Sequence, residues 1–446
     1  MIRKCLTLAM ALLIPLAAWA QRRPLSLEEA VSAGLEASPA LHASRMRLQS
    51  STAKAQEVAA ARLPSLRLGA GYTRLSEVPP FAVTLPGAPE PIVVSENFFN
   101  AWNLRLSVEQ PLFTGFRLQA GTESARMLER SAGQDLAKDR SELVFSIKTA
   151  YWGLARAREF AAVVEETIGQ VGEHLKDVRA FFDQGLLTRN EVLRTELQLS
   201  NAELLGIDAR NAVEVARTSL CTLLGLPLET DFELTTTAES QASRAPFADL
   251  PDDAEAAGRL VETALDSRPE IRSAEFRVKA SEAGLKAARS GRYPQVFLAG
   301  NYYYLRPNAR YMPAEDRFHG TWDIALSVSF DVWNWGRTAD QAEQAKAQLA
   351  QARDARKLLE DAAVLEVTQS RLALVQARDK LRVAGQAVGQ AEENLRIIRE
   401  RFRQGVALNS EVIDAETMLF QAKSGRTQAA IDLVLAQARL EKALGN

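Results

Sequence analysis

Two stretches of the chain alternate apolar and polar residues with a period of two. Their apolar positions are Trp102, Leu104, Leu106 and Val108 in the first stretch, and Trp322, Ile324, Leu326 and Val328 in the second. This alternation is typical of strands with one apolar and one polar face. Residues 66–75 and 296–305 alternate more weakly and supply the partner strands, in which Tyr72, Tyr302 and Tyr304 suggest an interfacial aromatic girdle. The pattern predicts two β-hairpins, about residues 64–110 and 294–331, with lipid-facing apolar sides.

The rest of the chain has helical periodicity over unusual lengths. Residues 117–184 contain no proline, and a rise of 1.5 Å per residue makes this a helix of roughly 100 Å. A 3,4 spacing typical of a coiled-coil seam runs through Ala161, Val164, Ile168, Val171, Leu175, Val178 and Phe182, and again through Leu381, Ala384, Val388, Ala391, Leu395, Ile398 and Phe402. Gly185 and Gly405 are expected to end the long helices. Return helices at 191–224 and 411–444 complete helical hairpins at 117–225 and 337–445.

The chain repeats itself internally. Arg62-Leu-Pro-Ser-Leu recurs as Arg292-Tyr-Pro-Gln-Val at a sequence offset of 230, and Gln184-Gly185 recurs as Gln404-Gly405 at an offset of 220. The two offsets differ by ten, which places a Pro-rich loop insertion between Tyr72 and Trp102. We therefore predict a tandem duplication, with a first repeat at 21–226, a linker or equatorial segment at 227–255, and a second repeat at 256–446.

Positions 1–20 have the features of a secretory signal peptide. Arg3 and Lys4 precede an apolar segment, and Ala18-Trp-Ala20 places small residues where signal peptidase cleaves. Cleavage removes Cys5 and leaves Cys221, which cannot form an internal disulfide. No later apolar run approaches the roughly 20 residues of a membrane-spanning helix. The near balance of 54 Lys+Arg against 56 Asp+Glu disfavours nucleic acid as a partner.

Catalysis has little support in the sequence. His42, His174 and His319 are far apart and are expected on a helix, a helix and a loop. The chain has no phosphate-binding loop, no paired-cysteine metal pattern and no nucleophile elbow. We expect a protein that is not an enzyme and that uses no cofactor and no metal.

Four amphipathic strands pose a problem of closure in a bilayer, because every strand edge must be paired there. Known barrels begin at about eight strands. Several chains must therefore contribute hairpins to one barrel, with their long helices bundled beneath it. A dimer would supply 8 strands and a trimer 12, and periodicity does not choose between them.

The combined pattern resembles the TolC-type outer-membrane efflux channel family over essentially the whole mature chain. The resemblance rests on the signal, the duplicated strand and helix pattern, and the segments Leu27-Glu-Glu-Ala-Val, Pro111-Leu-Phe-Thr-Gly, Val332-Trp-Asn-Trp-Gly-Arg and Arg401-Phe-Arg-Gln-Gly. It implies a mainly α homotrimer with a 12-strand barrel in the outer membrane and a 12-helix periplasmic tunnel. It also implies a passive conduit for efflux or type I secretion, coupled through a periplasmic adaptor (membrane fusion protein) to an inner-membrane transporter.

The resemblance also assigns residues at the helical turns. The turns that meet the adaptor correspond to Gly185, Leu186, Leu187, Thr188, Gly405, Val406, Ala407 and Leu408. Acidic residues of the pore constriction correspond to Glu411 and Asp414, and in the first repeat to Glu191 and Arg194, so only one acid is kept there. Three copies would form a carboxylate ring that favours cations. The family's gating arginine corresponds to Ala407, which does not support a salt-bridge latch.

Two simpler interpretations compete with these assignments. An acidic residue in the first turn of a helix is favoured by the helix dipole whatever the function, which applies to Glu191 and Glu411. For the whole chain, the rival is a periplasmic coiled-coil adaptor or structural spacer. Adaptors usually have one helical hairpin between β-rich halves, so two hairpins with lipid-type alternation favour the channel.

Overall fold

The computed structural model describes residues 23–79, 81–83, 86–87, 92–95, 97–244 and 254–445. The expected signal peptide at 1–20, with Cys5, and part of the linker at 227–255 therefore lie outside the described residues. Contacts divide the chain into unit 1 (Met1–Leu41, Arg140–Ala264 and Leu365–Asn446) and unit 2 (His42–Asp139 and Leu265–Val364). Each unit takes residues from both sequence repeats. The described helices are the larger part of the structure, as the predicted mainly α class requires.

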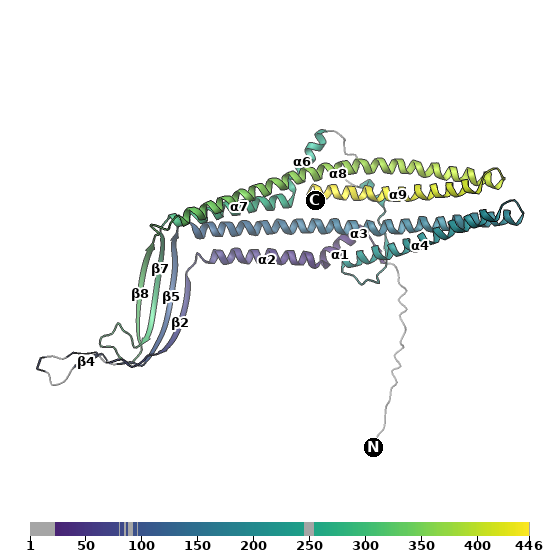
Figure 1. The fold of residues 1–446 in the computed structure, drawn as a ribbon. Helices are drawn as coiled ribbons and strands as arrows, with labels where there is room; N and C mark the ends of the chain where they lie inside the picture. Colours follow the sequence, from purple (N-terminus) through teal and green to yellow (C-terminus); the bar gives the residue numbers. More distant parts are fainter. Residues whose placement is uncertain are drawn as a thin grey trace, which may run out of the picture. The chain divides into compact units, whose positions relative to one another are not determined.

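Unit 2 contains a four-stranded antiparallel sheet. Its strands are β2 (Ser65–Arg74), β5 (Asn100–Thr114), β7 (Gln295–Arg306) and β8 (His319–Ser329), in the order β2-β5-β7-β8 (Figure 1). β2 and β8 are the edge strands. Side chains opposite one another share a face, so the register keeps the apolar positions of all four strands on one side.

Two expectations about this region were wrong. The segment between β2 and β5 was expected to be a loop, yet β3 (Phe81–Val83) pairs with β4 (Ile92–Ser95) within it. His319 was expected in a loop, but it is the first residue of β8. Pro and Gly on either side of the short strands masked their signal, since both residues are typical of turns.

Helices extend unit 2 beyond the sheet. α2 (Pro39–Ala60) and α7 (Pro269–Ala288) each begin at a proline, which fits the first helical turn. They accompany the N-terminal halves of α3 (Arg117–Asp183) and α8 (Arg337–Arg403), each 67 residues long. A short 3-10 helix, η1 (Arg289–Arg292), links α7 to β7. Asp135 of α3 accepts hydrogen bonds from Ser273 and Arg277 of α7, both at 2.6 Å.

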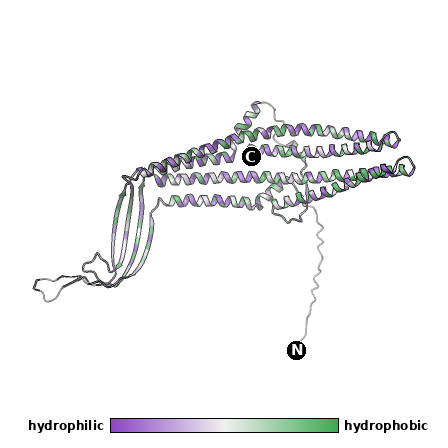
Figure 2. Ribbon diagram, viewed as in Figure 1, coloured by the Kyte–Doolittle hydropathy of each residue, from purple (hydrophilic) through white to green (hydrophobic). Residues whose placement is uncertain are grey.

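Unit 1 contains the C-terminal parts of α3 and α8, together with α4 (Arg189–Leu224) and α9 (Asn409–Ala443). Within this unit α3 and α9 lie between α4 and α8 (Figure 1). The predicted seam residues are buried or half-buried here, and the helices carry apolar and polar residues along their whole lengths (Figure 2). No helix in the described ranges is long and apolar enough to cross a membrane.

Smaller elements complete unit 1. α1 (Leu27–Ala37) begins with a capping box between Ser26 and Glu29. β1 (Arg23–Leu25) pairs in parallel with β6 (Phe232–Leu234), and α5 (Ala238–Arg244) and α6 (Ala254–Ser267) follow β6. Tyr151 of α3 is fully buried beside this pair. Its hydroxyl donates to the carbonyl of Leu25 at 3.1 Å and accepts from the N–H of Thr236 at 3.2 Å, which ties α3 to the segment after β6.

Candidate functional site

The two helical hairpins of unit 1 turn through glycines in the left-handed conformation. Gly185 has φ +72° and Gly405 has φ +74°. The N–H of Gly185 donates to Phe182 O at 2.8 Å, and the next N–H donates to Phe181 O at 2.9 Å. The same two bonds recur after α8, so both helices end in a Schellman motif. A side chain with a Cβ adopts this φ at a cost, which is why glycine stands at both positions.

The two turns line a shared groove of about 780 Å³. Six of the eight turn residues assigned from sequence line it: Leu186, Leu187, Thr188, Gly405, Ala407 and Leu408. Leu186, Val406 and Leu408 are 68%, 62% and 67% exposed. Such exposure of large apolar side chains at a helix turn marks a surface suited to a protein partner. We call this surface, made of the eight turn residues, the tip.

The acidic residues next to the tip have different surroundings. Glu411 and Asp414 are both exposed on the first turns of α9, and Glu411 Oε2 accepts the N–H of Leu408 at 3.2 Å. Glu191 is half-buried, and its Oε2 accepts from Asn409 Nδ2 at 2.9 Å. Arg194 lines the tip groove. The carboxylate of Glu191 is thus held within the chain, whereas Asp414 faces solvent.

A buried polar cluster lies behind the tip, and sequence reasoning missed it. Asn409 is 3% exposed and connects three helices. Its Oδ1 lies 2.7 Å from His174 Nε2 on α3, and its Nδ2 donates to Thr195 Oγ1 and to the carboxylate and carbonyl of Glu191 on α4. The ring of His174 also packs against Phe402, with centroids 5.1 Å apart. This cluster joins the two hairpins through hydrogen bonds rather than through apolar packing alone.

The titration of His174 is shifted by its burial. Loss of water around the ring lowers the pKa of His174, and the bond to Asn409 partly opposes this; the charges of Arg399 and Asp177 lower and raise it respectively. The neutral ring is therefore favoured in the folded protein. His174 directly precedes the seam residue Leu175, so a polar residue beside the apolar 3,4 pattern was the available signal.

The two repeats carry an equivalent ion pair in unequal surroundings. Arg179 contacts Glu196 at 2.6 Å in the first hairpin, and Arg399 contacts Glu416 at 2.8 Å in the second. The side chains of the first pair are 56% and 38% exposed, whereas those of the second are 29% and 2% exposed. Burial raises the pKa of Glu416, against the opposing effect of Arg399. Its second oxygen, Oε2, has no hydrogen-bond partner among the described residues.

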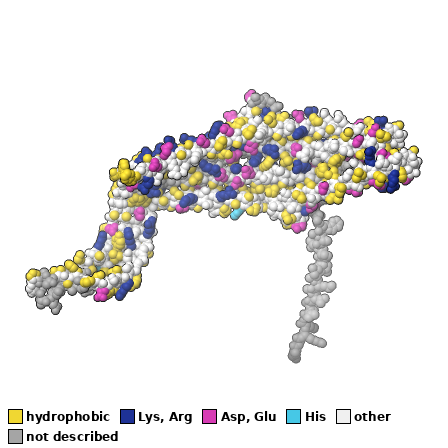
Figure 3. Space-filling view, viewed as in Figure 1, with side chains coloured by type: hydrophobic (Ala, Val, Ile, Leu, Met, Phe, Trp, Pro, Cys, Tyr) yellow, Lys and Arg dark blue, Asp and Glu magenta, His cyan; other side chains and the backbone are white. Residues whose placement is uncertain are grey.

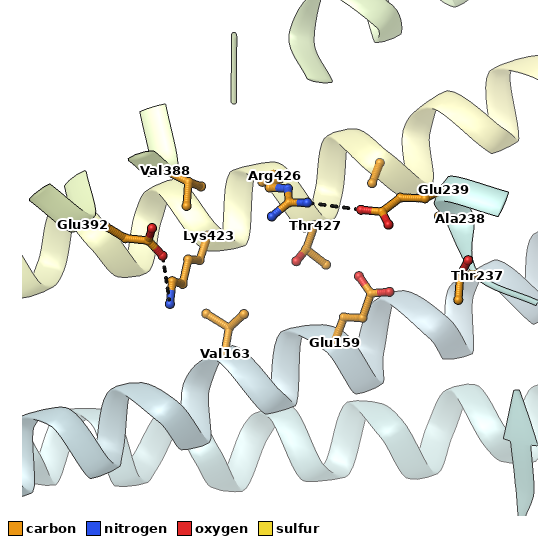
Figure 4. A pocket seen from close by; sticks show the side chains of 11 residues that line it. Glu159, Val163, Thr237, Ala238, Glu239, Val388, Glu392, Lys423, Arg426 and Thr427 are labelled. Atoms are coloured by element: carbon orange, nitrogen blue, oxygen red, sulfur yellow. Dashed lines mark hydrogen bonds and ion pairs between the residues drawn. The ribbon is translucent and has the colours of Figure 1, made fainter. Parts of the chain in front are cut away.

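A charged cleft of about 430 Å³ lies farther from the turns, between α3, α5, α8 and α9 (Figure 4). Lys423 of α9 lies 2.7 Å from Glu166 and 3.5 Å from Glu392, and Arg426 lies 3.1 Å from Glu239. Glu159 points into the cleft (Figure 4). Burial and the charge of Glu239 raise the pKa of Glu159, and Arg426 opposes them. These pairs tie α9 to α3, α8 and α5.

The sheet of unit 2 exposes the predicted apolar rows. Trp322, Ile324, Leu326 and Val328 are 63–69% exposed, and Trp102, Leu104, Leu106 and Val108 are 40–44% exposed. Tyr72 lies beside Trp102 with ring centroids 4.6 Å apart. Hydrophobic side chains are also visible over the strands and where β8 leads into α8 (Figure 3), where Val332, Trp333 and Trp335 are 75–87% exposed. The sheet presents an apolar surface that nothing in the described chain covers.

Comparison with known proteins gives consistent matches. The model of the outer membrane efflux protein family matches residues 30–226 and 260–446. Outer membrane efflux protein BepC of Brucella suis is 25% identical over 342 residues, which are 76% of this chain and 71% of that protein. Toluene efflux pump outer membrane protein TtgC of Pseudomonas putida is 23% identical over 74% of this chain and 66% of its own length. The crystal structure of the outer membrane protein VceC from Vibrio cholerae has a TM-score of 0.79 at 20% identity, and covers 94% of this chain and 96% of that chain.

Proposed function

The chain belongs to the outer membrane efflux protein family, and we propose that it forms the outer-membrane channel of a tripartite efflux or type I secretion system. Three chains close a 12-strand barrel in the outer membrane and a 12-helix tunnel in the periplasm. The channel is passive, and an inner-membrane transporter supplies the energy through a periplasmic adaptor. The relatives named for efflux and the alkaline protease secretion protein AprF of Pseudomonas aeruginosa, 22% identical, support this range of systems.

The observation that carries the proposal is the one-sided sheet. Its apolar rows are exposed along all four strands, while the opposite face carries Arg67, Arg105, Glu109, Asn301 and Asp323. Such a sheet requires lipid on one side and water on the other. Its edge strands β2 and β8 need partners, because an unpaired edge is not tolerated in a bilayer. Hairpins from further copies of the chain provide them.

The helices of unit 1 support a ring of copies. α4 exposes a stripe of apolar side chains, Leu193, Leu197, Leu204, Ile207 and Val215, which are 51–64% exposed. On the other side of the unit, α8 exposes Leu365, Leu372, Val383 and Ile397, which are 43–58% exposed. Two different surfaces that pair produce a head-to-tail contact, which closes into a ring when the rotation between successive copies allows it. We assign the α4 stripe of one chain to the α8 stripe of the next.

At the tip, the proposal gives each residue group a role. The exposed turn residues dock the adaptor, with Leu186, Val406 and Leu408 as its apolar contacts. Asp414 and Glu411 form the constriction, where three copies place six carboxylates around the entrance. Glu191 contributes less to this ring, because its carboxylate is held by Asn409.

Fractionation, cross-linking and conductance test the channel together. We expect the protein in the outer membrane, as a trimer that conducts ions in planar lipid bilayers. Ile207 lies as many residues after Gly185 as Val383 lies before Gly405. The two positions are therefore equally far from the turns, one on each stripe. Ile207→Cys with Val383→Cys should form a disulfide ladder that stops at the trimer, and Ile207→Cys alone should not. A soluble periplasmic monomer without conductance would refute the proposal.

The constriction is tested separately. Glu411→Gln with Asp414→Asn should lower cation selectivity and weaken block by divalent cations, because both depend on the carboxylate ring. Glu203→Gln, an exposed acid of α4 away from the tip, is the control and should change neither. Conducting channels with unchanged selectivity in the double variant would remove both residues from the constriction.

A further inference from the structure

The apolar face of the sheet has a notch lined by two pairs of aromatic rings. The rings of Tyr72 and Trp102 have centroids 4.6 Å apart, and those of Tyr304 and Phe318 stack with centroids 5.0 Å apart. Both pairs line a groove of about 490 Å³, together with Ala70, whose side chain is short. We call this groove the aromatic notch.

The notch lies toward the end of the sheet that is farthest from the helices. β2 follows α2 and ends at Arg74, and β7 follows η1 and ends at Arg306. On the apolar face of β7, Val296 and Arg306 are ten positions apart, which at a rise of about 3.4 Å and a tilt of about 40° gives roughly 26 Å of depth. The apolar band of an outer-membrane barrel is about 25 Å tall. The notch therefore lies just inside one boundary of this band, and Arg74 lies at or beyond the boundary.

Polar side chains form the outer rim of the notch on the same face. Arg74 and Asn100 are paired in the register, in the row next to that of Tyr72 and Trp102. Asn100 Oδ1 accepts a hydrogen bond from the Tyr72 hydroxyl at 2.9 Å and from Arg74 Nη1 at 2.7 Å. The guanidinium of Arg74 also lies 5.1 Å from the centre of the Phe99 ring. These contacts hold an arginine beside an apolar groove.

The two arginines at this rim differ in how their charge is used. Arg306 donates to both carboxylate oxygens of Asp316, each at 3.0 Å, and lies 5.9 Å from the centre of the Phe318 ring. It therefore supports a wall of the notch with its own charge offset. In the part of the chain that the structure describes, no carboxylate pairs with Arg74. A guanidinium with free N–H donors is suited to bind a phosphate group.

We propose that the aromatic notch binds one molecule of the phosphorylated glycolipid of the outer leaflet, lipid A, with an acyl chain along the rings and a phosphate on Arg74. This inference rests on the proposed channel, because its barrel puts this end of the sheet in the outer leaflet, opposite the periplasmic helices. An anionic lipid matches both parts of the site, since the rings and Ala70 contact the apolar chain and the guanidinium contacts the phosphate. Each chain carries a complete site, so a trimer has three.

The test is native mass spectrometry of the purified, delipidated trimer, titrated in detergent with lipid A that carries both phosphates. We expect up to three bound lipids per trimer, and weaker binding of lipid A from which the phosphates have been removed. Arg74→Gln should weaken binding about tenfold, because charge-assisted hydrogen bonds to the phosphate are lost. Ala70→Trp should also weaken binding, because it fills the notch. Arg105→Gln removes the same charge from the opposite face of the sheet, so it is the matched control and should bind as the wild type does.

Conductance in planar bilayers separates this proposal from the channel itself. Conducting trimers in which Arg74→Gln and Arg105→Gln bind lipid A equally well would overturn the lipid site and leave the channel intact. Equally tight binding of phosphatidylglycerol by the wild type would overturn the assignment to the glycolipid. A wild-type protein that neither forms trimers nor conducts would overturn the channel. If Ala70→Trp does not assemble, Arg74→Gln carries the test, since the side chain of Arg74 is exposed at the rim.

Discussion

The unequal burial of the two equivalent ion pairs leads to a quantitative prediction. Arg399→Met leaves Glu416, 2% exposed, as a buried carboxylate without its cation. Breaking a buried pair from one side costs about 3–5 kcal/mol, and because Arg399 is itself 29% exposed we take the lower end, about 3 kcal/mol. The same change at Arg179, whose pair is largely exposed, should cost about 0.5 kcal/mol.

Hydrogen exchange measures this difference locally. We expect amides around residues 412–419 of α9 to open roughly 100-fold more often in Arg399→Met, since each 1.4 kcal/mol is a factor of about ten. Arg179→Met is the matched control in the other hairpin and should change protection near Glu196 by about a factor of two. Equal protection in the two variants would refute the argument from burial.

The pH dependence of the same variant has a definite sign. Burial raises the pKa of Glu416 and Arg399 opposes that shift, so removing the arginine raises the pKa further. For a carboxyl group with a raised pKa, the favourable contribution to stability is present below the unfolded value and is lost as the pH rises through the folded pKa. The protection lost in Arg399→Met should therefore recover as the pH falls toward the range in which Glu416 gains a proton.

Three further predictions concern the tip and the buried cluster behind it. Asn409→Ala leaves the buried His174 without its partner and should lower the free energy of local opening by about 1–3 kcal/mol, measured by hydrogen exchange near the turns. The neighbouring Ser410→Ala should have little effect. Because the pKa of His174 is lowered, its contribution to folding stability is complete above the unfolded-state pKa of 6.5 and is lost as the pH falls below that value. His174→Gln keeps a hydrogen-bond donor and should remove this pH dependence of stability. If His174→Gln kept the wild-type dependence of stability on pH, His174 would be excluded as the source of that dependence. In Gly405→Ala the added Cβ meets no neighbouring atom, but the alanine must adopt φ +74°, which should lower the free energy of unfolding by about 1–2 kcal/mol in a thermal unfolding experiment. Gly389→Ala, within α8, should instead stabilise the protein.

Local sequence signals predicted the elements that depend on local physics. Period-two alternation located the exposed apolar rows of the sheet, and the glycines at 185 and 405 located the helix ends. The parallel pair of β1 and β6 joins segments that are far apart in the sequence, and strands this short give no periodic signal. The ribbon of β3 and β4 was hidden by the proline and glycine around it.

The site was less predictable than the fold, because its contacts are long-range. His174 and Asn409 are 235 residues apart, and nothing local to either one indicates the other. Arg179 with Glu196 and Arg399 with Glu416 have the same spacing of 17 residues. Only tertiary packing distinguishes the exposed pair from the buried one. Family resemblance supplied the turn and acidic residues, but not the polar cluster behind them.

The open sheet of unit 2 also has a consequence for how the protein is made. A newly exported chain carries two unpaired strand edges, β2 and β8, and apolar rows that are up to 69% exposed. Unpaired edges beside apolar surface are a template for aggregation. Until the two edges and the apolar rows are covered, copies of the chain can pair with one another through β2 or β8 in the wrong register.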